Sequence, residues 1–442
     1  MALATSSYMQ ASARRSAGRI VIPIAFSAAV IAIVLIARPP SAQARLDSQA
    51  QRFVTLALSL GRIDPREVDA YFGPAKLTPP GPAPSLDKMD AELARLRADI
   101  LQDEASPRRD RLEGLTSQLA ALVEARRTPN ALSFDEETRR LYHLRIAPPD
   151  QARLAQARAQ LEALLPGPGD LPDRLAAFRD RYVIPADKRQ AVFTRALAEC
   201  RARTLAHWPL PADERVDVDW SRDVDAAWQR YQGGARSTLQ INPDSVAYIG
   251  SALDVACHEA YPGHHAQFLL QRAGAGAAGP LVEDTVVLLR SPQQVLREGA
   301  AEYGVEVAFP LQDRAAFQRD VLFPLAGFPP DEAAKYVQVH ALARQAAAAA
   351  APILRDYHDG RKTFFDAAYA LETEALIASP RALLEYEDRY GAYAASYGAA
   401  ADLVARCVEA RRRGGEQERW SLLRDIVADG DLSALSGEAC AA

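Results

Sequence analysis

The 442-residue sequence has little cysteine and no surplus of positive charge. Its 52 basic residues are outnumbered by 57 acidic residues, and the formal net charge is −5. Because proteins hold nucleic-acid backbones mainly through excess positive charge, this balance argues against a nucleic-acid partner. The four cysteines form no C-x-x-C pair, which argues against a thiolate metal site and against thioredoxin-like chemistry.

Beyond residue 44, the sequence has no segment that is long and apolar enough to span a bilayer. The one long uncharged apolar stretch is residues 20–37, which follow three arginines and precede Ala42-Gln43-Ala44. This order is typical of a secretory signal, so we predict that residues 1–44 direct export to the periplasm or the extracellular space. A stretch of this length also reaches the lower limit for a spanning helix. The alternative is therefore a retained inner-membrane anchor through residues 20–37, the one case in which we expect membrane contact.

Most of the remaining chain has apolar residues at helical spacings of three and four. We predict a mainly helical (α+β) fold, with a helical amino-terminal region at 45–210 and a metal-site region at 211–442 that form one continuous unit. The cysteines of an exported chain can form disulfides, and four cysteines allow three pairings. The clearest predicted helices are Leu46–Leu60, Leu86–Leu101, Arg109–Arg126, Gln151–Leu165 and Lys188–His207.

A short β region interrupts the helical pattern. Arg215–Trp220 alternates apolar and polar residues, as a half-buried strand does. Trp228–Tyr231 and Ser237–Ile241 flank Gly233-Gly234, which is typical of a hairpin. We therefore predict a small sheet just before the segment that carries the chemistry.

That segment contains three of the seven histidines within eight residues, His258-Glu259-Ala260-Tyr261-Pro262-Gly263-His264-His265. About forty residues later come Glu298 and Glu302, four positions apart. Histidine and carboxylate ligands from two helices, with one acid to spare, are what a catalytic zinc ion needs. The spare acid beside the first ligand can take a proton from water.

The histidine spacing differs from the H-E-x-x-H pattern, whose histidines lie on one face of a helix. Here the fourth position after His258 is Pro262, and the next histidines come six and seven positions after it. On a regular helix the seventh position lies about 10 Å farther along the axis. However, Pro262 cannot donate a helical hydrogen bond, and Gly263 tolerates unusual backbone angles. We expect a local bulge that brings either His264 or His265 back towards His258.

The sequence H-E-A-Y-P-G-H-H-A-Q, followed by E-G-A-A-E-Y, resembles the bacterial family labelled domain of unknown function 885. Val68-Asp69-Ala70-Tyr71-Phe72-Gly73-Pro74 resembles an amino-terminal motif of that family. The E-G-x-A element also resembles the helix that carries the third zinc ligand in gluzincin aminopeptidases. Ala300 stands where the family has tryptophan, and the late family element is reduced to Arg389-Tyr390 and Tyr397-Gly398.

The resemblance implies a zincin-like metallopeptidase fold and a role for each motif residue. His258 and either His264 or His265 would bind Zn2+, and Glu298 would complete the ligand set. Glu259 would be the general base, and Glu302 would orient a ligand. The implied activity is hydrolysis of a peptide substrate.

Tyr390, Tyr393 and Tyr397 recur at helical spacing, so we expect them to share one helix face. A packed aromatic stripe is the simpler interpretation. The functional one is that Tyr397 donates a hydrogen bond to the oxyanion formed during hydrolysis.

Two other functions fit the same residues. A metal-bearing binding protein without catalysis would keep the histidines but would not need Glu259. A zinc hydrolase of a non-peptide amide or ester would use every residue named for the peptidase.

Overall fold

The computed structural model describes residues 40–442 except for 130, 225, 275–280, 431–434, 436–439 and 441–442. The predicted signal segment therefore lies almost entirely outside the described residues. Its last three residues, Ala42–Ala44, begin the first helix. Among the described residues, no helix is both long enough and apolar enough to cross a bilayer.

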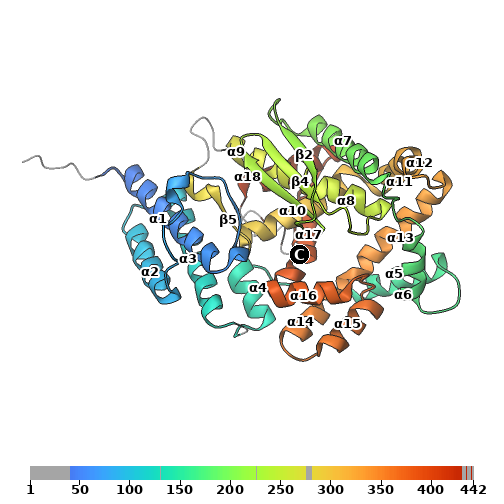
Figure 1. Ribbon diagram of the computed structural model, residues 1–442, viewed down its shortest axis with the longest axis horizontal. Helices are drawn as coiled ribbons and strands as arrows, with labels where there is room; N and C mark the ends of the chain where they lie inside the picture. The colour runs from blue at the N-terminus through green and yellow to red at the C-terminus, as the bar shows by residue number, and fades with distance from the viewer. Residues whose placement is uncertain are drawn as a thin grey trace, which may run out of the picture. The chain divides into compact units, whose positions relative to one another are not determined.

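The described chain is mainly helical, which confirms the predicted fold class (Figure 1). Its amino-terminal half contains α1 (Ala42–Ile63), β1 (Val68–Tyr71), α2 (Leu86–Leu101), α3 (Pro107–Arg127), α4 (Phe134–Tyr142), α5 (Gln151–Leu164), α6 (Leu171–Asp180) and α7 (Arg189–His207). The middle contains β2 (Arg215–Trp220), β3 (Ala227–Gly233), β4 (Arg236–Ile241), α8 (Ile249–Glu259), α9 (His264–Gly274), β5 (Val286–Leu288) and α10 (Pro292–Ala308). The remainder contains α11 (Leu311–Phe317), α12 (Phe323–Ala326), α13 (Ala333–Ala346), α14 (Ala350–His358), α15 (Phe364–Thr373), α16 (Pro380–Tyr390), α17 (Tyr393–Arg411) and α18 (Glu416–Asp429).

Local sequence explains where several helices begin. Ser85 accepts a hydrogen bond from the backbone N–H of Lys88 and starts α2, and Ser106 caps α3 ahead of Pro107. Ser133 and Glu136 form a reciprocal capping box at α4. These caps satisfy backbone donors that a helix start otherwise leaves unpaired.

The three-stranded sheet has the order β2-β4-β3. β3 and β4 form the predicted antiparallel hairpin, and β2 runs parallel to β4. Within the described chain, β3 therefore pairs on one side only, and its other edge faces away from the sheet. A separate antiparallel pair joins β1 to β5.

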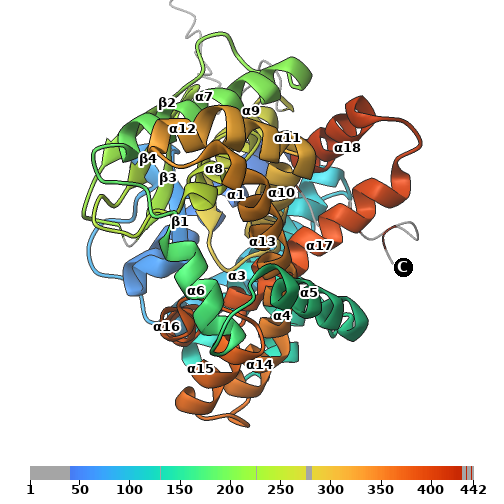
Figure 2. The ribbon, with the colours of Figure 1, turned by 90° about the vertical axis from the view of Figure 1, so that its right-hand side faces the viewer.

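Residues 42–442 form one unit with two large hydrophobic clusters. One cluster is built from α1–α4 and α14–α16, and the other from α5–α9, α11–α13 and α18, so they do not divide at residue 210. Helices α10 and α17 pack together and contribute to both clusters. The three-stranded sheet and α14–α16 lie on opposite sides of α10 (Figure 1, Figure 2). The metal motifs of α8, α9 and α10 are thus held at the centre of the unit.

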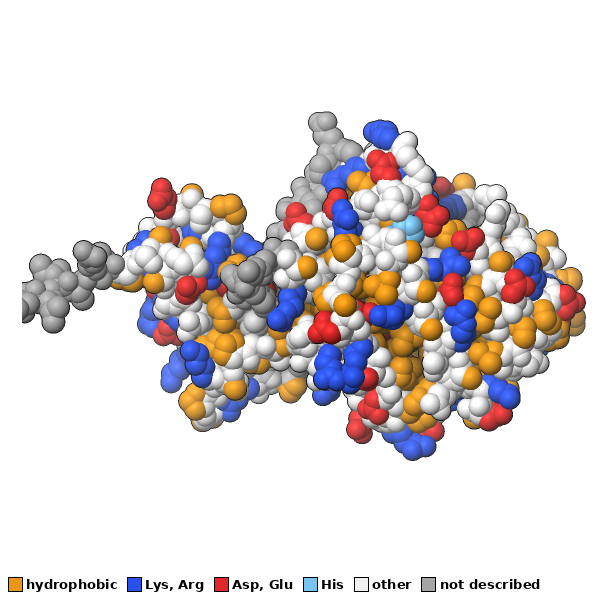
Figure 3. All heavy atoms as spheres, turned by 90° about the horizontal axis from the view of Figure 1, so that it is seen from above, with side chains coloured by type: hydrophobic (Ala, Val, Ile, Leu, Met, Phe, Trp, Pro, Cys, Tyr) orange, Lys and Arg blue, Asp and Glu red, His pale blue; other side chains and the backbone are white. Residues whose placement is uncertain are grey.

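Two disulfides connect helices or helix ends, and both have ordinary Cα–Cα separations. Cys200–Cys257 joins α7 to α8, and Cys407–Cys440 ties α17 to the carboxyl terminus. This is one of the three pairings that the sequence allows. Paired cysteines are typical of proteins exported to an oxidising compartment. Acidic and basic side chains are intermixed on the face drawn in Figure 3, in line with the balanced composition.

Candidate metal centre

Between His258 and His264 a short turn of non-helical residues interrupts the helix, at the place where the sequence predicted a bulge. α8 ends at Glu259 and α9 begins at His264. The backbone N–H of Gly263 donates to the carbonyl of Cys257 at 3.0 Å. A Cβ atom on Gly263 would lie 1.6 Å from the carbonyl oxygen of His258, so only glycine fits this position. The turn brings the imidazoles of His258 and His264 to a centroid distance of 4.8 Å.

Both imidazoles face one carboxylate oxygen of α10. Nε2 of His258 lies 3.1 Å from Oε2 of Glu298, and Nε2 of His264 lies 3.4 Å from the same oxygen. One ligand atom from each of the three residues fits within 4.8 Å of the others. Two imidazole nitrogens and a carboxylate oxygen are suitable donors for zinc and similar divalent cations. We call His258, His264 and Glu298 the metal cluster.

His265 lies outside the metal cluster. Its Nδ1 is 2.8 Å from Oγ of Ser237 on β4, and its Nε2 is 3.1 Å from Oε2 of Glu214. The hydroxyl of Tyr261 donates to the same oxygen of Glu214. The side chains of His265 and Glu214 are both fully buried. We call Glu214, Ser237, Tyr261 and His265 the anchor cluster. Of the two histidines that the sequence left open, the structure places His264 beside His258 and Glu298, whereas both ring nitrogens of His265 face Ser237 and Glu214.

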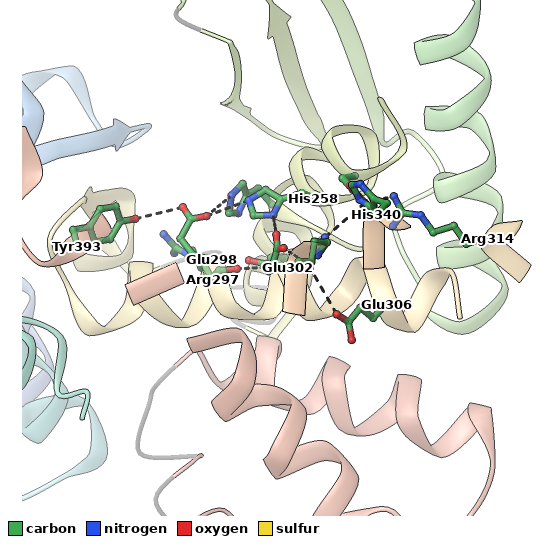
Figure 4. A network of polar contacts seen from close by, with 12 residues as sticks. His258, Arg297, Glu298, Glu302, Glu306, Arg314, His340 and Tyr393 are labelled. Atoms are coloured by element: carbon green, nitrogen blue, oxygen red, sulfur yellow. Dashed lines mark hydrogen bonds and ion pairs between the residues drawn. The ribbon is translucent and has the colours of Figure 1, made fainter. Parts of the chain in front are cut away.

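The second oxygen of Glu298 is held by two neighbours that the sequence did not indicate. Nε2 of Gln294, one turn earlier on α10, donates to Oε1 at 3.0 Å. The hydroxyl of the buried Tyr393 donates to Oε1 at 3.4 Å. These contacts fix the carboxylate so that Oε2 points at the histidines (Figure 4).

Glu302 contacts the ring nitrogen of His258 that faces away from Glu298. Its Oε2 lies 3.2 Å from Nδ1 of His258, which leaves Nε2 to face Glu298. Arg344 on α13 forms an ion pair with Glu302 and lies 3.8 Å from Asp254, one turn before His258. Asp254 also pairs with His340 at 2.8 Å (Figure 4). His340 and Arg344 of α13 thus hold Asp254 and Glu302, two acidic residues near His258.

Glu259 is close to the metal cluster but is not one of its three members. Burial raises the pKa of the Glu259 carboxyl, and the charges of His258 and His264 partly offset this shift. The backbone N–H of Gln229 on β3 donates to the Glu259 carboxylate. A carboxylate with a raised pKa is a better proton acceptor, which suits the predicted general base.

The charged groups of the metal cluster also shift one another's pKa values. Burial by itself lowers the pKa of His258, but hydrogen bonds with Glu298 and Glu302 raise it well above its usual value. Burial raises the pKa of Glu298, but the charge of His264 and the hydrogen bonds with both histidines lower it well below the usual range. Glu298 is therefore ionised and stabilises the protonated form of His258, and a bound cation would have to displace that proton.

The three tyrosines do not share one helix face, so that prediction was wrong. Tyr390 ends α16 and Tyr393 begins α17, with Gly391 between them at a φ of 64°. The backbone N–H of Ala392, the next residue, donates to Oε1 of Glu137 at 3.1 Å and holds the chain at this break. Tyr397 lies on α17 near Tyr393, and its hydroxyl is 3.2 Å from that of Tyr386. Burial and the charge of Glu298 raise the pKa of Tyr397, which stays a neutral donor at neutral pH.

Asp69 on β1 is a further charged group at the site. Burial raises the pKa of its carboxyl to about 6, and the charge of Glu298 adds to this rise. It lines a cavity of about 420 Å³ between β1 and β3, and no hydrogen bond or ion pair holds its carboxylate among the described residues. The motif around Asp69 was visible in the sequence, but nothing there placed it beside residues 258–302.

Comparison with known proteins gives only distant similarities. No family model and no curated protein matches the chain. A protein of unknown function from Shewanella oneidensis, provisionally described as a lipoprotein, superposes with a TM-score of 0.43 at 12% identity, over 77% of this chain and 72% of that protein. A crystal structure of BsuCP superposes with a TM-score of 0.38 at 9% identity, over 89% of this chain and 90% of that protein. Similarities this weak carry no argument about function.

Proposed function

We propose that this chain is an exported zinc-dependent peptidase. The convergence of His258 Nε2, His264 Nε2 and Glu298 Oε2 within 4.8 Å is the observation that carries the proposal. Three protein ligands are characteristic of catalytic zinc sites, whereas structural sites are closed by four. The described residues contribute three members to this group, and Glu259 is next to the first of them.

Each residue has a distinct task in this proposal. When bound, zinc acts as a Lewis acid that brings the pKa of water towards neutrality. Glu259 would act as the general base that takes a proton from the attacking water and delivers it to the leaving amine. Glu302 keeps the His258 ring in the orientation that presents Nε2. Tyr397 donates a hydrogen bond from its hydroxyl to the developing oxyanion and keeps its proton.

The free edge of β3 favours a peptide over other amides and esters. Within the described chain β3 pairs only with β4, and its residues 228–232 line the cavity of about 420 Å³. An extended peptide can add to such an edge through main-chain hydrogen bonds. The Gln229 backbone contact with Glu259 connects this edge to the general base. We also propose membership of the domain of unknown function 885 family, because its motif residues His258, His264 and Glu298 converge.

The test uses the mature protein, residues 45–442, loaded with zinc and offered a peptide library. We expect cleavage by the unmodified protein, and Glu259→Gln should keep zinc but lower kcat by about 10²- to 10⁴-fold, the usual contribution of a general base. Glu306→Gln is the matched control, because Glu306 lies one turn beyond Glu302 on α10 and its side chain is 65% exposed.

The outcomes separate the competing functions. Bound zinc without turnover of any substrate would favour a metal-bearing binding protein. Turnover limited to esters or non-peptide amides, lost in Glu259→Gln, would favour the other zinc hydrolase. Unchanged peptide cleavage by Glu259→Gln would contradict the assigned general base.

A further inference from the structure

Arg297, the residue before Glu298 on α10, is held by neutral groups rather than by an acid. Its Nη2 donates to Oε1 of Gln271 at 3.0 Å, and its Nη1 donates to Oε1 of Gln294 at 3.4 Å. Its guanidinium carbon lies 4.7 Å from the centre of the Phe268 ring. Among the described residues, no carboxylate comes within 4.0 Å of it, and its buried Nε has no hydrogen-bond partner. Charged groups removed from water are normally paired, so this guanidinium has capacity for an anion.

The acidic residues near Arg297 do not occupy its unused N–H donors. Asp284 is paired with Arg111 at 2.6 Å, and Asp69 acts on Arg297 only over a longer distance than an ion pair. A guanidinium has five N–H donors in a planar fork, and two of them are used by the glutamines. The remaining donors, which include Nε, match the two oxygens of a carboxylate.

Arg297, whose neighbour Glu298 belongs to the metal cluster, also lines a second cavity. This cavity has a volume of about 100 Å³ and shares Phe72, Tyr231 and Phe268 with the larger cavity between β1 and β3. Phe268 lies one turn beyond His264 on α9, and Arg297 lies beside Glu298 in Figure 4.

We propose that Arg297 binds a carboxylate of the substrate next to the cleaved bond, so that the chain end or an acidic residue is selected there. This inference rests on the proposed peptidase function and names the substrate class that the site prefers. The free carboxyl terminus of a peptide is one source of the carboxylate, and an aspartate or glutamate side chain is the other. With the first source the protein is a carboxypeptidase, and with the second it cleaves beside acidic residues.

The test measures binding of fluorescent peptides to the zinc-loaded Glu259→Gln protein, in which chemistry is suppressed. Three peptides of one neutral sequence are compared: one ends in a free carboxylate, one in an amide, and one in an amide with a terminal glutamate residue. We expect the free acid or the glutamate peptide to bind about 10- to 100-fold more tightly than the neutral amide, the range of a charge-assisted hydrogen bond. Which of the two binds more tightly identifies the source of the carboxylate.

The same peptides are then offered to Glu259→Gln combined with Arg297→Gln, Arg297→Lys or Arg272→Gln. The preference should disappear with glutamine, persist in part with lysine, and stay unchanged with Arg272→Gln, because Arg272 lines the same cavity but is exposed. Zinc content and melting temperature are measured in parallel. Their retention in Arg297→Gln, together with loss of the preference, separates carboxylate binding from packing against Phe268.

Equal binding of the acids and the neutral amide, with Arg297 present, would overturn this inference alone. A preference that survives Arg297→Gln would also overturn it. No binding and no cleavage of any peptide would overturn the proposed peptidase function, and this inference with it.

Discussion

His264 and His265 are neighbours at the start of α9, yet their imidazoles belong to different clusters. His264 meets His258 at one oxygen of Glu298, and the three ligand atoms converge on one point. In the anchor cluster, the two ring nitrogens of His265 have separate partners, Ser237 and Glu214. What separates the two histidines is convergence: ligand atoms of three residues that gather within 4.8 Å indicate a cation site, whereas separate partners on opposite sides of one ring indicate a structural role.

The anchor cluster also supports the metal cluster. Ser237 belongs to β4, and Nε2 of Gln229 on β3 donates to its hydroxyl at 2.6 Å. His265 therefore fixes the start of α9 against the sheet, and the sheet presents the Gln229 backbone to Glu259. The anchor cluster thus fixes the helix that carries His264, and the metal cluster contains the candidate ligands.

The largest effect should come from Gly263→Ala, which affects both clusters at once. Because the added Cβ would lie 1.6 Å from the His258 carbonyl oxygen, the turn cannot form. We expect a loss of more than about 4 kcal/mol in the free energy of unfolding, together with loss of zinc binding, measured by urea unfolding and metal content. The control is Gly114→Ala on α3, where a Cβ meets nothing within 4 Å. A stable, zinc-binding Gly263→Ala protein would contradict this account of the turn.

The next effect separates the two histidines. His264→Ala removes a ligand, so zinc affinity should fall by more than the roughly 10- to 100-fold caused by losing an outer-shell partner. The matched variant His265→Ala should lower zinc affinity much less, because His265 contacts Ser237 and Glu214 and supports the ligands only indirectly. A zinc titration with a competing chelator measures both. The reverse order of affinities would show that the roles of the two histidines have been exchanged.

The free energy of unfolding should show the opposite order: His265→Ala should lower it more than His264→Ala does. His265→Ala leaves the fully buried Glu214 carboxylate without one of its partners, which should cost about 3 kcal/mol. His264→Ala should cost less, because the Glu298 carboxylate keeps His258, Gln294 and Tyr393 as partners. Urea unfolding of both proteins without metal provides the measurement. Equal destabilisation by the two variants would remove the distinction between the clusters.

A smaller effect is expected from the residue that orients His258. Glu302→Gln should lower zinc affinity by about 10- to 100-fold, because the carboxylate at Nδ1 fixes the ring. Glu306→Gln, on the next turn of α10, should change it little. If both variants bind zinc as the unmodified protein does, Glu302 has no orienting role.

The smallest effect concerns pH. Burial raises the pKa of Glu214, but hydrogen bonds from His265, Tyr261 and Arg201 lower it below the ordinary value of 4.5. A carboxyl with a lowered pKa in the folded state stabilises the protein above its ordinary pKa, and this stability is lost as pH falls further. Metal-free protein should therefore lose stability below about pH 4.5 more steeply than Glu214→Gln does. Parallel pH profiles of the urea midpoint would contradict this.

Short-range patterns were enough to predict much of the fold. α2 and β2 begin and end at the predicted residues, because a serine cap and a strict alternation of burial define them locally. The break between Tyr390 and Tyr393 was not predicted, because it depends on Glu137, which is distant in the sequence.

The site was predicted as a set of residues but not as a geometry. Choosing between His264 and His265 required the conformation of the turn at Gly263 and the position of Glu214, which no spacing rule supplies. Asp69 and Arg297 were missed as site residues for the same reason, since their surroundings come from β3, α9 and α10 together.

The most direct test is a crystal structure of the mature protein grown with zinc, with diffraction data recorded on both sides of the zinc absorption edge. The account predicts one strong anomalous peak, at about 2.0–2.2 Å from His258 Nε2, His264 Nε2 and a Glu298 carboxylate oxygen. His265 should remain bound to Ser237 and Glu214. A peak bonded to His265, or no peak among these residues, would contradict the metal centre on which the proposed function rests.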